Sequence, residues 1–373
     1  MVRFFLALLL ACSCAHAAAP QPPSVMGRSW VLADLSSGQL LAAEKPAERV
    51  EPASLTKLMT AYLVFAALRE RKLSLEQRVN VSERAWRAAG ARMFIEPRRP
   101  VTVEELIRGV VVQSGNDACI ALAEAVAGSE EAFVRMMNRE AERLGMKDTR
   151  FMNASGLPDP QHYSTAHDLY LLAAALIRDF PAQYAQYYAQ KAYRYNNITQ
   201  PNRNRLLWLD PSVDGVKTGH TEAAGYCLVA SSRRGGRRLL SVLLGSTSES
   251  ARAQESQKLL NWGFQFFDSV KLYGAGDAVK SLEVWKGAAD AVKVGVQADL
   301  FLTVPKGEAD KLKAELVSQQ PLVAPLASGQ RVGTLRVTLD GNPHGEYPLV
   351  ALEQVGQAGW FGRAWDTLRL WAR

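Results

Sequence analysis

The segment EPASLTKLMTAYLVF, residues 51–65, places one serine and one lysine in an otherwise apolar run. Pro52 precedes residues that favour a helix, so we expect a buried helix to begin near Ser54. Residues three apart on a helix lie on one face, which predicts that the Ser54 hydroxyl and the Lys57 ammonium are within reach of each other. The alternative is structural: Ser54 caps the helix and Lys57 extends its charge to solvent.

Two further polar motifs interrupt apolar segments. In VVVQSGNDACIALAEAVAG, residues 110–128, Ser114-Gly115-Asn116 separates two helical patterns and is expected to project into something other than the core. A plain turn between helices is the alternative. In VDGVKTGHTEAAGYCLVAS, residues 213–231, Lys217 lies on an expected strand and Thr218-Gly219 follows, which indicates a sheet edge that another backbone can approach closely.

The three motifs S-x-x-K, S-x-N and K-T-G, in this order, resemble those of the penicillin-recognising serine acyl-transferases. The closer resemblance is to the low-molecular-mass D-alanyl-D-alanine carboxypeptidases of the penicillin-binding protein 5/6 type, and it covers nearly the whole mature chain. Cys227, where we expect a polar residue, is a small departure that does not touch the chemistry. Other segments similar to this family are LIRGVVVQSGNDACIALAE, NRNRLLW and KLLNWGFQFF.

The resemblance implies an α/β (α+β) fold of the β-lactamase/transpeptidase type, with an antiparallel sheet flanked by helices. A small C-terminal all-β sandwich domain and a terminal amphipathic helix are expected after it. The expected division is a signal peptide at 1–17, a catalytic domain at 18–268, a β-rich domain at 269–356 and a membrane-anchor helix at 357–373.

The chemistry of the three motifs can be argued from the residues themselves. A serine hydroxyl attacks only when a base takes its proton, and a lysine can be that base only if its pKa falls well below about 10. The apolar helix desolvates Lys57, and a second ammonium, Lys217, disfavours its charged form further. Ser114 would then relay the proton to the leaving amine, while Asn116 holds Lys57 and the substrate amide. Ser54 is the expected nucleophile.

The backbone N–H groups at Ser54 and His220 would form an oxyanion hole, and a peptide would add to the strand edge. A carboxypeptidase must also bind the free carboxylate of its leaving residue. Arg203 and Arg252 are candidates for this role, and the alternative for each is a surface ion pair. The resemblance assigns the carboxylate end to Lys217, Thr218, Gly219 and His220, with Arg203 and Arg252 as further candidates.

Two other functions remain open at this point. A class A β-lactamase shares the three motifs, but it needs a glutamate with a nearby asparagine on a loop between the last two of them, and no Glu-x-x-x-Asn occurs between Ser114 and Lys217. Gly115 also stands where those enzymes usually carry an aspartate. A non-catalytic wall-binding protein on the same scaffold would carry a damaged motif, whereas all three are intact.

The N-terminus reads as a cleaved secretory signal, with Arg3, an apolar stretch and a small-residue site at residues 15–17. A lipoprotein signal at Cys12 is the alternative. The mature chain then has two cysteines, Cys119 and Cys227, both in apolar contexts that favour buried free thiols over a disulfide. The protein is expected to be exported.

The last hundred residues change in pattern. In GQRVGTLRVTLDGNPHGEYPLVALEQV, residues 329–355, apolar and polar residues alternate and Asp340-Gly341 supplies a turn, so we expect hairpins of a β-sandwich that acts as a spacer or protein-contact module. Its partners cannot be read from the sequence. A terminal helix is expected to have one apolar face, and Leu370 is the one apolar residue that falls outside it. The face consists of Trp360, Phe361, Ala364, Trp365, Leu368 and Trp371.

The composition narrows the possible partners. The net charge of +7 is spread along the chain without a nucleic-acid-binding motif, which excludes nucleic acid as the expected partner. No metal-ligand spacing is present, so neither a cofactor nor a metal is expected. The expected partners are peptidoglycan pentapeptide stems, β-lactam antibiotics and, through the terminal helix, anionic lipid on the periplasmic face of the inner membrane. Packing of that helix on its own β domain is the alternative.

Overall fold

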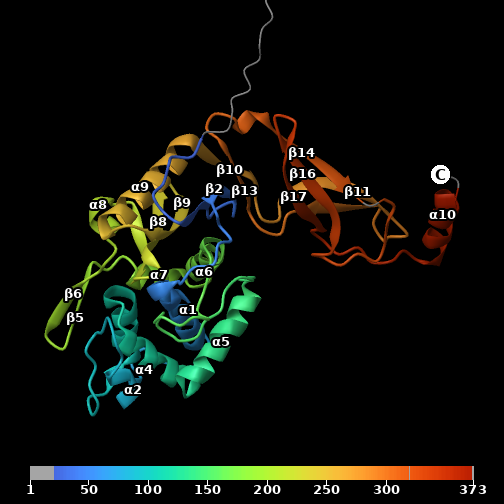
Figure 1. Ribbon diagram of the computed structural model, residues 1–373. Helices are drawn as coiled ribbons and strands as arrows, with labels where there is room; N and C mark the ends of the chain where they lie inside the picture. The colour runs from blue at the N-terminus through green and yellow to red at the C-terminus, as the bar shows by residue number, and fades with distance from the viewer. Residues whose placement is uncertain (1–20, 319, 372–373) are drawn as a thin grey trace, which may run out of the picture.

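A computed structural model describes residues 21–318 and 320–371. The chain forms a larger mixed α/β part and a smaller β-rich part beyond α9, with a helix at the far end of the β-rich part (Figure 1). This arrangement confirms the expected fold class. The predicted signal peptide, residues 1–17, lies outside the described residues.

The larger part is organised around a five-stranded sheet in which every pair of neighbours is antiparallel. Strand β7, which carries the K-T-G motif, lies at one edge of the sheet, as the sequence predicts. In spatial order the strands are β2 (Leu40–Glu44), β1 (Ser29–Asp34), β9 (Arg237–Ser246), β8 (Gly225–Arg234) and β7 (Val213–Thr221).

Successive side chains of β1 point alternately into two hydrophobic cores, one on each face of this sheet. Val31 and Ala33 belong to the larger hydrophobic core, whereas Trp30 and Leu32 belong to a second core on the opposite face. The second core is closed by α8 (Leu206–Leu209) and α9 (Glu249–Phe266), and the larger core by α1 (Lys57–Arg69), α6 (Ala166–Asp179) and the helices around them (Figure 1).

A cluster of helices lies beside the larger core, in the lower part of Figure 1. Its central feature is a break between two helices at Ser114-Gly115, where the sequence predicts an interruption. Short ribbons β3 (Arg78–Val79) with β4 (Val101–Thr102) and β5 (Ala192–Tyr195) with β6 (Ile198–Pro201) flank the cluster. The remaining helices are α2 (Glu83–Trp86), α3 (Val103–Arg108), the π-helical η2 (Gly109–Gln113), α4 (Asn116–Ala127), α5 (Glu130–Arg143) and α7 (Pro181–Tyr187).

The β-rich part contains a two-stranded sheet, β10–β13, and a six-stranded sheet in the order β14-β16-β17-β12-β11-β15. The predicted hairpin joins β16 and β17 through Asp340 and Gly341, both at positive φ, as a tight two-residue turn requires. The elements are β10 (Phe267–Tyr273), β11 (Ala278–Trp285), β12 (Ala291–Gly295), β13 (Leu300–Pro305), η3 (Ala309–Lys311), β14 (Leu312–Ser318), β15 (Leu322–Val323), β16 (Arg331–Leu339) and β17 (Asn342–Ala351).

The terminal helix α10 (Trp360–Trp371) contacts the β-rich part through its polar side. The backbone N–H of Lys286 donates to Asp366 Oδ2 at 2.6 Å, and the Arg369 guanidinium lies 5.4 Å from the Trp285 ring centre. Leu370, which the helical pattern misplaces, lines a small pocket there. The alternative of a helix docked on its own β domain is thus present, but by the polar side, because Trp360, Phe361, Trp365, Leu368 and Trp371 are 64% to 92% exposed.

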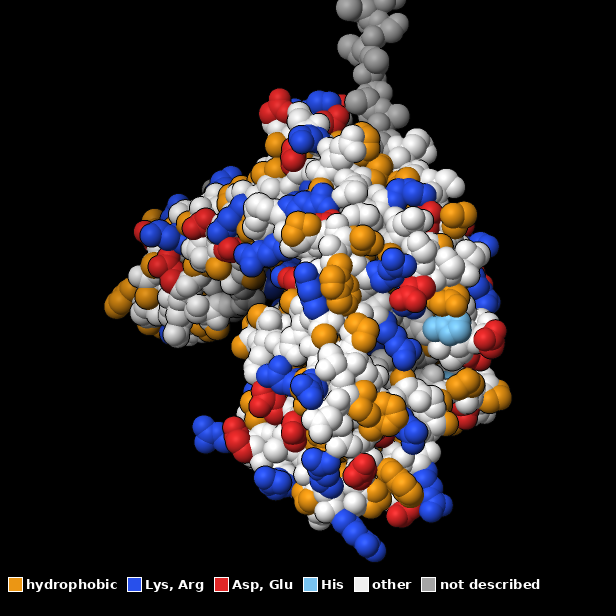
Figure 2. All heavy atoms as spheres, turned by 90° about the vertical axis from the view of Figure 1, so that its left-hand side faces the viewer, with side chains coloured by type: hydrophobic (Ala, Val, Ile, Leu, Met, Phe, Trp, Pro, Cys, Tyr) orange, Lys and Arg blue, Asp and Glu red, His pale blue; other side chains and the backbone are white. Residues whose placement is uncertain are grey.

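No helix in residues 21–318 or 320–371 has the length and apolar character needed to cross a bilayer. The two predicted thiols, Cys119 and Cys227, are buried and free, which confirms that expectation. On the face shown in Figure 2, Lys and Arg side chains are interspersed with acidic and apolar ones, in line with the spread of charge along the sequence.

Candidate active site

Ser54 lies in a tight turn, not at a capping position. It belongs to a 3-10 helix, η1 (Ala53–Thr56), that runs directly into α1, and neither segment has a side-chain cap. The residue before it, Ala53, has φ 46°, a left-handed conformation that costs a non-glycine residue about 1–2 kcal/mol. The structural alternative, in which Ser54 caps the helix, is therefore wrong, and backbone strain is stored next to the hydroxyl.

Lys57 is buried below Ser54, with 1% of its surface exposed. Its Nζ lies 2.9 Å from Ser54 Oγ, the contact that the three-residue spacing predicts, and it donates to Asn116 Oδ1 at 2.7 Å and to the Ser155 carbonyl at 2.6 Å. Burial, with a smaller contribution from the cation of Arg203, lowers the pKa of this ammonium to about 8.

These three contacts have a direct chemical consequence. A neutral amine carries two N–H donors, and the acceptors on Asn116 and Ser155 use both. The remaining lone pair then faces the third neighbour, the Ser54 hydroxyl. The arrangement can therefore take a proton from Ser54 without moving Lys57.

Ser114 occupies the break between η2 and α4 in a left-handed conformation, φ 61° and ψ 33°. Its hydroxyl accepts a 3.0 Å hydrogen bond from Lys217 Nζ, which also donates to the Thr218 carbonyl. Burial lowers the pKa of Lys217 well below its ordinary value, and the Lys57 ammonium lowers it further. The plain turn that the sequence left open as an alternative is instead a strained turn that aims a serine at a buried lysine.

Asn116 and its neighbour tie the loop before β4 to the site. The Asn116 side-chain amide donates to the Ala89 carbonyl at 2.6 Å, while the Asp117 carboxylate accepts from the backbone N–H groups of Met93 and Phe94 at 3.0 and 2.8 Å. Asn116 therefore holds Lys57 and is itself held. Asp117 has no such role in the sequence prediction, because the N–H groups that donate to it lie more than twenty residues away along the chain.

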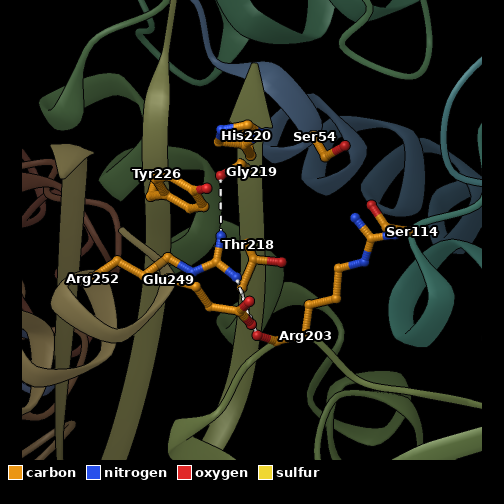
Figure 3. Close-up of a pocket in the computed structure, with 9 residues that line it drawn as sticks. All are labelled: Ser54, Ser114, Arg203, Thr218, Gly219, His220, Tyr226, Glu249 and Arg252. Carbon is orange, nitrogen blue, oxygen red and sulfur yellow. Dashed lines mark hydrogen bonds and ion pairs between the residues drawn. The ribbon is translucent and has the colours of Figure 1, made fainter. Parts of the chain in front are cut away.

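The motifs meet at one pocket of about 250 Å³ (Figure 3). Lys57, Asn116 and Lys217 do not line it but are buried; Lys57 and Lys217 contact its two serines, and Asn116 contacts Lys57. All ten predicted site residues are thus brought together. The lining residues are Ser54, Ser114, Arg203, Thr218, Gly219, His220, Tyr226, Glu249 and Arg252.

Gly219 allows strand β7 to approach the turn that carries Ser54. A Cβ atom at this position would lie 3.1 Å from the Pro52 carbonyl oxygen and 3.3 Å from Ala53 Cβ, closer than side chains ordinarily pack. The close approach that the sequence predicts is therefore filled by the chain's own turn, which sets Ser54 opposite the strand.

Arg252 is a buried side chain whose ion pair, with Glu249 at 3.4 Å, lies at the pocket. It is 4% exposed and donates to the carbonyl oxygens of Gly219 at 3.4 Å and Arg203 at 3.3 Å, as the dashed lines in Figure 3 show. The Arg203 side chain extends into the same pocket. Two guanidinium groups therefore face one small space, as expected of a site for a carboxylate.

Two lining residues, Tyr226 and Glu249, are missing from the sequence prediction. Tyr226 pairs with His220 across β7 and β8, and the two rings, tilted by 36°, have their centres 4.1 Å apart. Strand pairing could have found Tyr226, because it follows the K-T-G strand after one turn. Glu249 gives no such signal: it is the first residue of α9 and reaches the pocket only through the fold.

Comparisons with known proteins agree over both parts of the chain. A family model described as D-alanyl-D-alanine carboxypeptidase matches residues 16–248, and one described as penicillin-binding protein 5, C-terminal domain, matches residues 267–357. The chain is 44% identical to the D-alanyl-D-alanine carboxypeptidase DacC of Escherichia coli over 354 residues, which cover 93% of this chain and 88% of that protein.

Solved structures give the same result. Penicillin-binding protein 5 from Haemophilus influenzae superposes with a TM-score of 0.88 at 41% identity, covering 91% of this chain and all of that chain. The ampicillin-bound form of penicillin-binding protein D2 from Listeria monocytogenes superposes with a TM-score of 0.60 at 30% identity, covering 65% of this chain and all of that chain. The chain therefore belongs to the family of serine-type D-alanyl-D-alanine carboxypeptidases.

Proposed function

We propose that the protein performs its carboxypeptidase reaction through an acyl-enzyme on Ser54, with Lys57 as the base. The observation that carries this assignment is the geometry of Lys57 Nζ, which has two fixed acceptors and the Ser54 hydroxyl as its third neighbour. A pKa of about 8 leaves a substantial neutral fraction near neutral pH.

In the first step Ser54 Oγ attacks the carbonyl carbon of the penultimate D-alanine and its proton passes to Lys57. The oxyanion would be stabilised by the backbone N–H groups of Ser54 and His220, which line one pocket. Collapse of this intermediate breaks the C–N bond. Ser114, hydrogen-bonded to Lys217, relays the proton to the departing amine of the terminal D-alanine.

Water completes the cycle. It attacks the acyl carbon, its proton passes to Lys57, and Ser54 Oγ leaves with a proton, so the shortened stem is released and the enzyme is restored. Asn116 holds Lys57 in place throughout through its Oδ1, while its Nδ2 is held by the Ala89 carbonyl and Asn116 does not line the pocket, so the expected contact with the substrate amide is not part of this proposal.

The terminal carboxylate is assigned to the cationic end of the pocket. Arg252 and Arg203 provide the guanidinium groups, while Thr218 and His220 line the strand side. A peptide stem would lie beside Thr218 and His220 of the edge strand β7, where that strand lines the pocket, and pair with it there. β-Lactams, which carry a carboxylate next to a reactive amide, would acylate Ser54 by the same contacts.

For the rest of the chain we propose the division expected from the sequence: a signal peptide at 1–17, a catalytic domain at 18–268, a β-rich domain at 269–356 and an anchor helix at 357–373. The exposed aromatic face of α10 supports reversible binding to anionic lipid. The protein would then lie on the periplasmic face of the inner membrane as a peripheral protein.

The direct test is release of free D-alanine from a pentapeptide that ends in D-Ala-D-Ala. The wild-type protein should release one D-alanine per peptide, and Ser54→Ala should release none while keeping its melting temperature. No release by the wild type, or undiminished release by Ser54→Ala, would overturn the assignment.

A further inference from the structure

Glu249 is the one carboxylate among the described residues that line the active-site pocket. Its Oε1 lies 3.4 Å from Nη2 of Arg252 (Figure 3), and the two side chains differ in exposure, 49% for Glu249 and 5% for Arg252. A buried cation is thus paired with an acid that reaches in from the rim of the pocket.

Arg252 is weakly paired without a ligand. Its hydrogen bonds to Gly219 O, Arg203 O and Glu249 Oε1 all measure 3.3–3.4 Å, longer than the 2.7–2.9 Å or so typical of charge-assisted bonds. Burial lowers the pKa of Arg252, and the Glu249 carboxylate is the largest influence in the opposite direction. The guanidinium therefore retains capacity for a closer, bidentate anion.

Glu249 has a second favourable position. It is the first residue of α9, directly after the N-cap Ser248, where a carboxylate is stabilised by the helix dipole whether or not it contacts Arg252. Because half of its side chain is exposed, it can rotate into solvent without breaking a packed interface. Arg252, in contrast, is fixed by burial.

We propose that Glu249 is a specificity-determining residue that occupies Arg252 in the free enzyme and yields that place to the terminal carboxylate of the incoming chain. This inference rests on the proposed role of Arg252 in binding the carboxylate. The exchange keeps the buried guanidinium paired before and after binding, at the cost of weaker affinity for carboxylate-terminated ligands. A neutral residue at position 249 would bind those ligands more tightly.

The test compares Glu249→Gln with the wild type on an acylated D-Ala-D-Ala peptide and on the matching peptide with a terminal amide. KM for the carboxylate peptide should fall about threefold to tenfold with kcat within about twofold, as expected for removal of a half-exposed competing charge. The Ki of the amide peptide, measured against penicillin acylation, should stay unchanged. Glu222→Gln, which removes an exposed charge in the β7–β8 turn, is the matched control and should behave as wild type.

Arg252→Gln separates this inference from the proposed function. It should lose the preference for carboxylate over amide, and Glu249→Gln added to it should change nothing further. If Arg252→Gln keeps the wild-type preference, the carboxylate site and this inference both fail. If that preference is lost but Glu249→Gln leaves KM unchanged, or changes the amide equally, only the role of Glu249 is overturned.

Discussion

At the scale of single residues, the proposed mechanism requires that Lys57 lose its proton. Lys57→Arg keeps a cation at the site, but a guanidinium does not deprotonate in a protein, so penicillin acylation should fall by a factor of about 100 or more. The measurement is the second-order acylation rate, with melting temperature as the check on folding. Lys147→Arg, at an exposed position, is the control. Near-normal acylation by Lys57→Arg would move the base to Ser114 with Lys217.

The pH dependence follows from the same ammonium. Because burial lowers the pKa of Lys57 to about 8, acylation should rise with pH and level off above that value. The free energy of unfolding should also rise with pH between 8 and 10.5. In this range the unfolded lysine still holds its proton whereas the folded one has lost it, so the cost of burying the charge shrinks. Acylation rates between pH 6 and 9 test this, and a flat profile would contradict it.

Gly156 supports the strained turn that carries Ser54. A Cβ at this position would lie 1.8 Å from the Ala53 carbonyl oxygen, whereas Gly128 has a similar φ, +80° against +84°, and open space around it. Both alanine variants carry left-handed strain of about 1–2 kcal/mol. Only Gly156→Ala should also slow acylation, by about tenfold or more, because it displaces the nucleophile. Equal acylation rates in the two variants would show that the contact does not matter.

The sequence predicted most of the site at this scale because its chemistry is encoded in short motifs. Ser54 and Lys57 are one helical turn apart, so their contact is local. Tyr226 and Glu249 were missed, and the reason is physical: each enters the pocket by strand pairing or helix placement, which spacing along the chain does not specify.

At the scale of elements, the sequence pattern predicted the break at Ser114 but not its backbone conformation. The polar triplet predicted an interruption between helices, and the structure adds that the preceding turn is π-helical and that Ser114 is left-handed. Neither property has a sequence signature here, since Val110, Val111 and Val112 are compatible with an ordinary helix. π-helical turns inside helices often mark functional sites, which agrees with its place beside Lys217.

Helix α10 has the two faces, one apolar and one polar, that its sequence pattern predicts. Its apolar face is exposed and its polar face docks through Asp366 and Arg369, the reverse of what an ordinary packing helix would show. Leu370, out of place on a lipid-binding face, is accounted for by the pocket that it lines with Trp285 and Pro321. These contacts orient the helix with its tryptophans outward.

Removal of residues 360–373 should therefore leave a soluble enzyme with intact penicillin binding. In the full chain, Trp360→Glu with Trp365→Glu should reduce pelleting with anionic vesicles about tenfold or more, because two exposed aromatic anchors are lost. Trp208→Glu, at a 47% exposed tryptophan of the catalytic part, is the matched control. Equal pelleting of the truncated and full chains would contradict the anchor.

At the scale of the whole molecule, the two parts are joined by contacts that no sequence motif predicts. Thr303 of β13 contacts the β1–β2 turn through two hydrogen bonds. Its backbone N–H donates to Gln39 Oε1 at 2.6 Å, and its hydroxyl lies 2.7 Å from the hydroxyl of Ser37. Arg237 donates to the Phe267 carbonyl where α9 passes into β10. Figure 1 shows α10 at the end of the β-rich part remote from the catalytic sheet, so an anchored enzyme would hold its active site away from the lipid surface.

The alternating pattern after Phe267 predicted a β-rich domain, and it is present. Strand order could not be derived this way, because β1 pairs with β9 across more than two hundred residues and such pairing depends on tertiary packing. The family resemblance supplied the expected catalytic fold, whereas the junction around Thr303 became visible only in the structure.

The central claim is that Ser54 is the residue acylated by both substrate and β-lactam. Its most direct test is peptide mass mapping of the protein after brief treatment with benzylpenicillin. The account predicts a single penicilloyl adduct on the peptide that contains Ser54, absent from Ser54→Ala. An adduct on Ser114, or an unchanged adduct in Ser54→Ala, would contradict it.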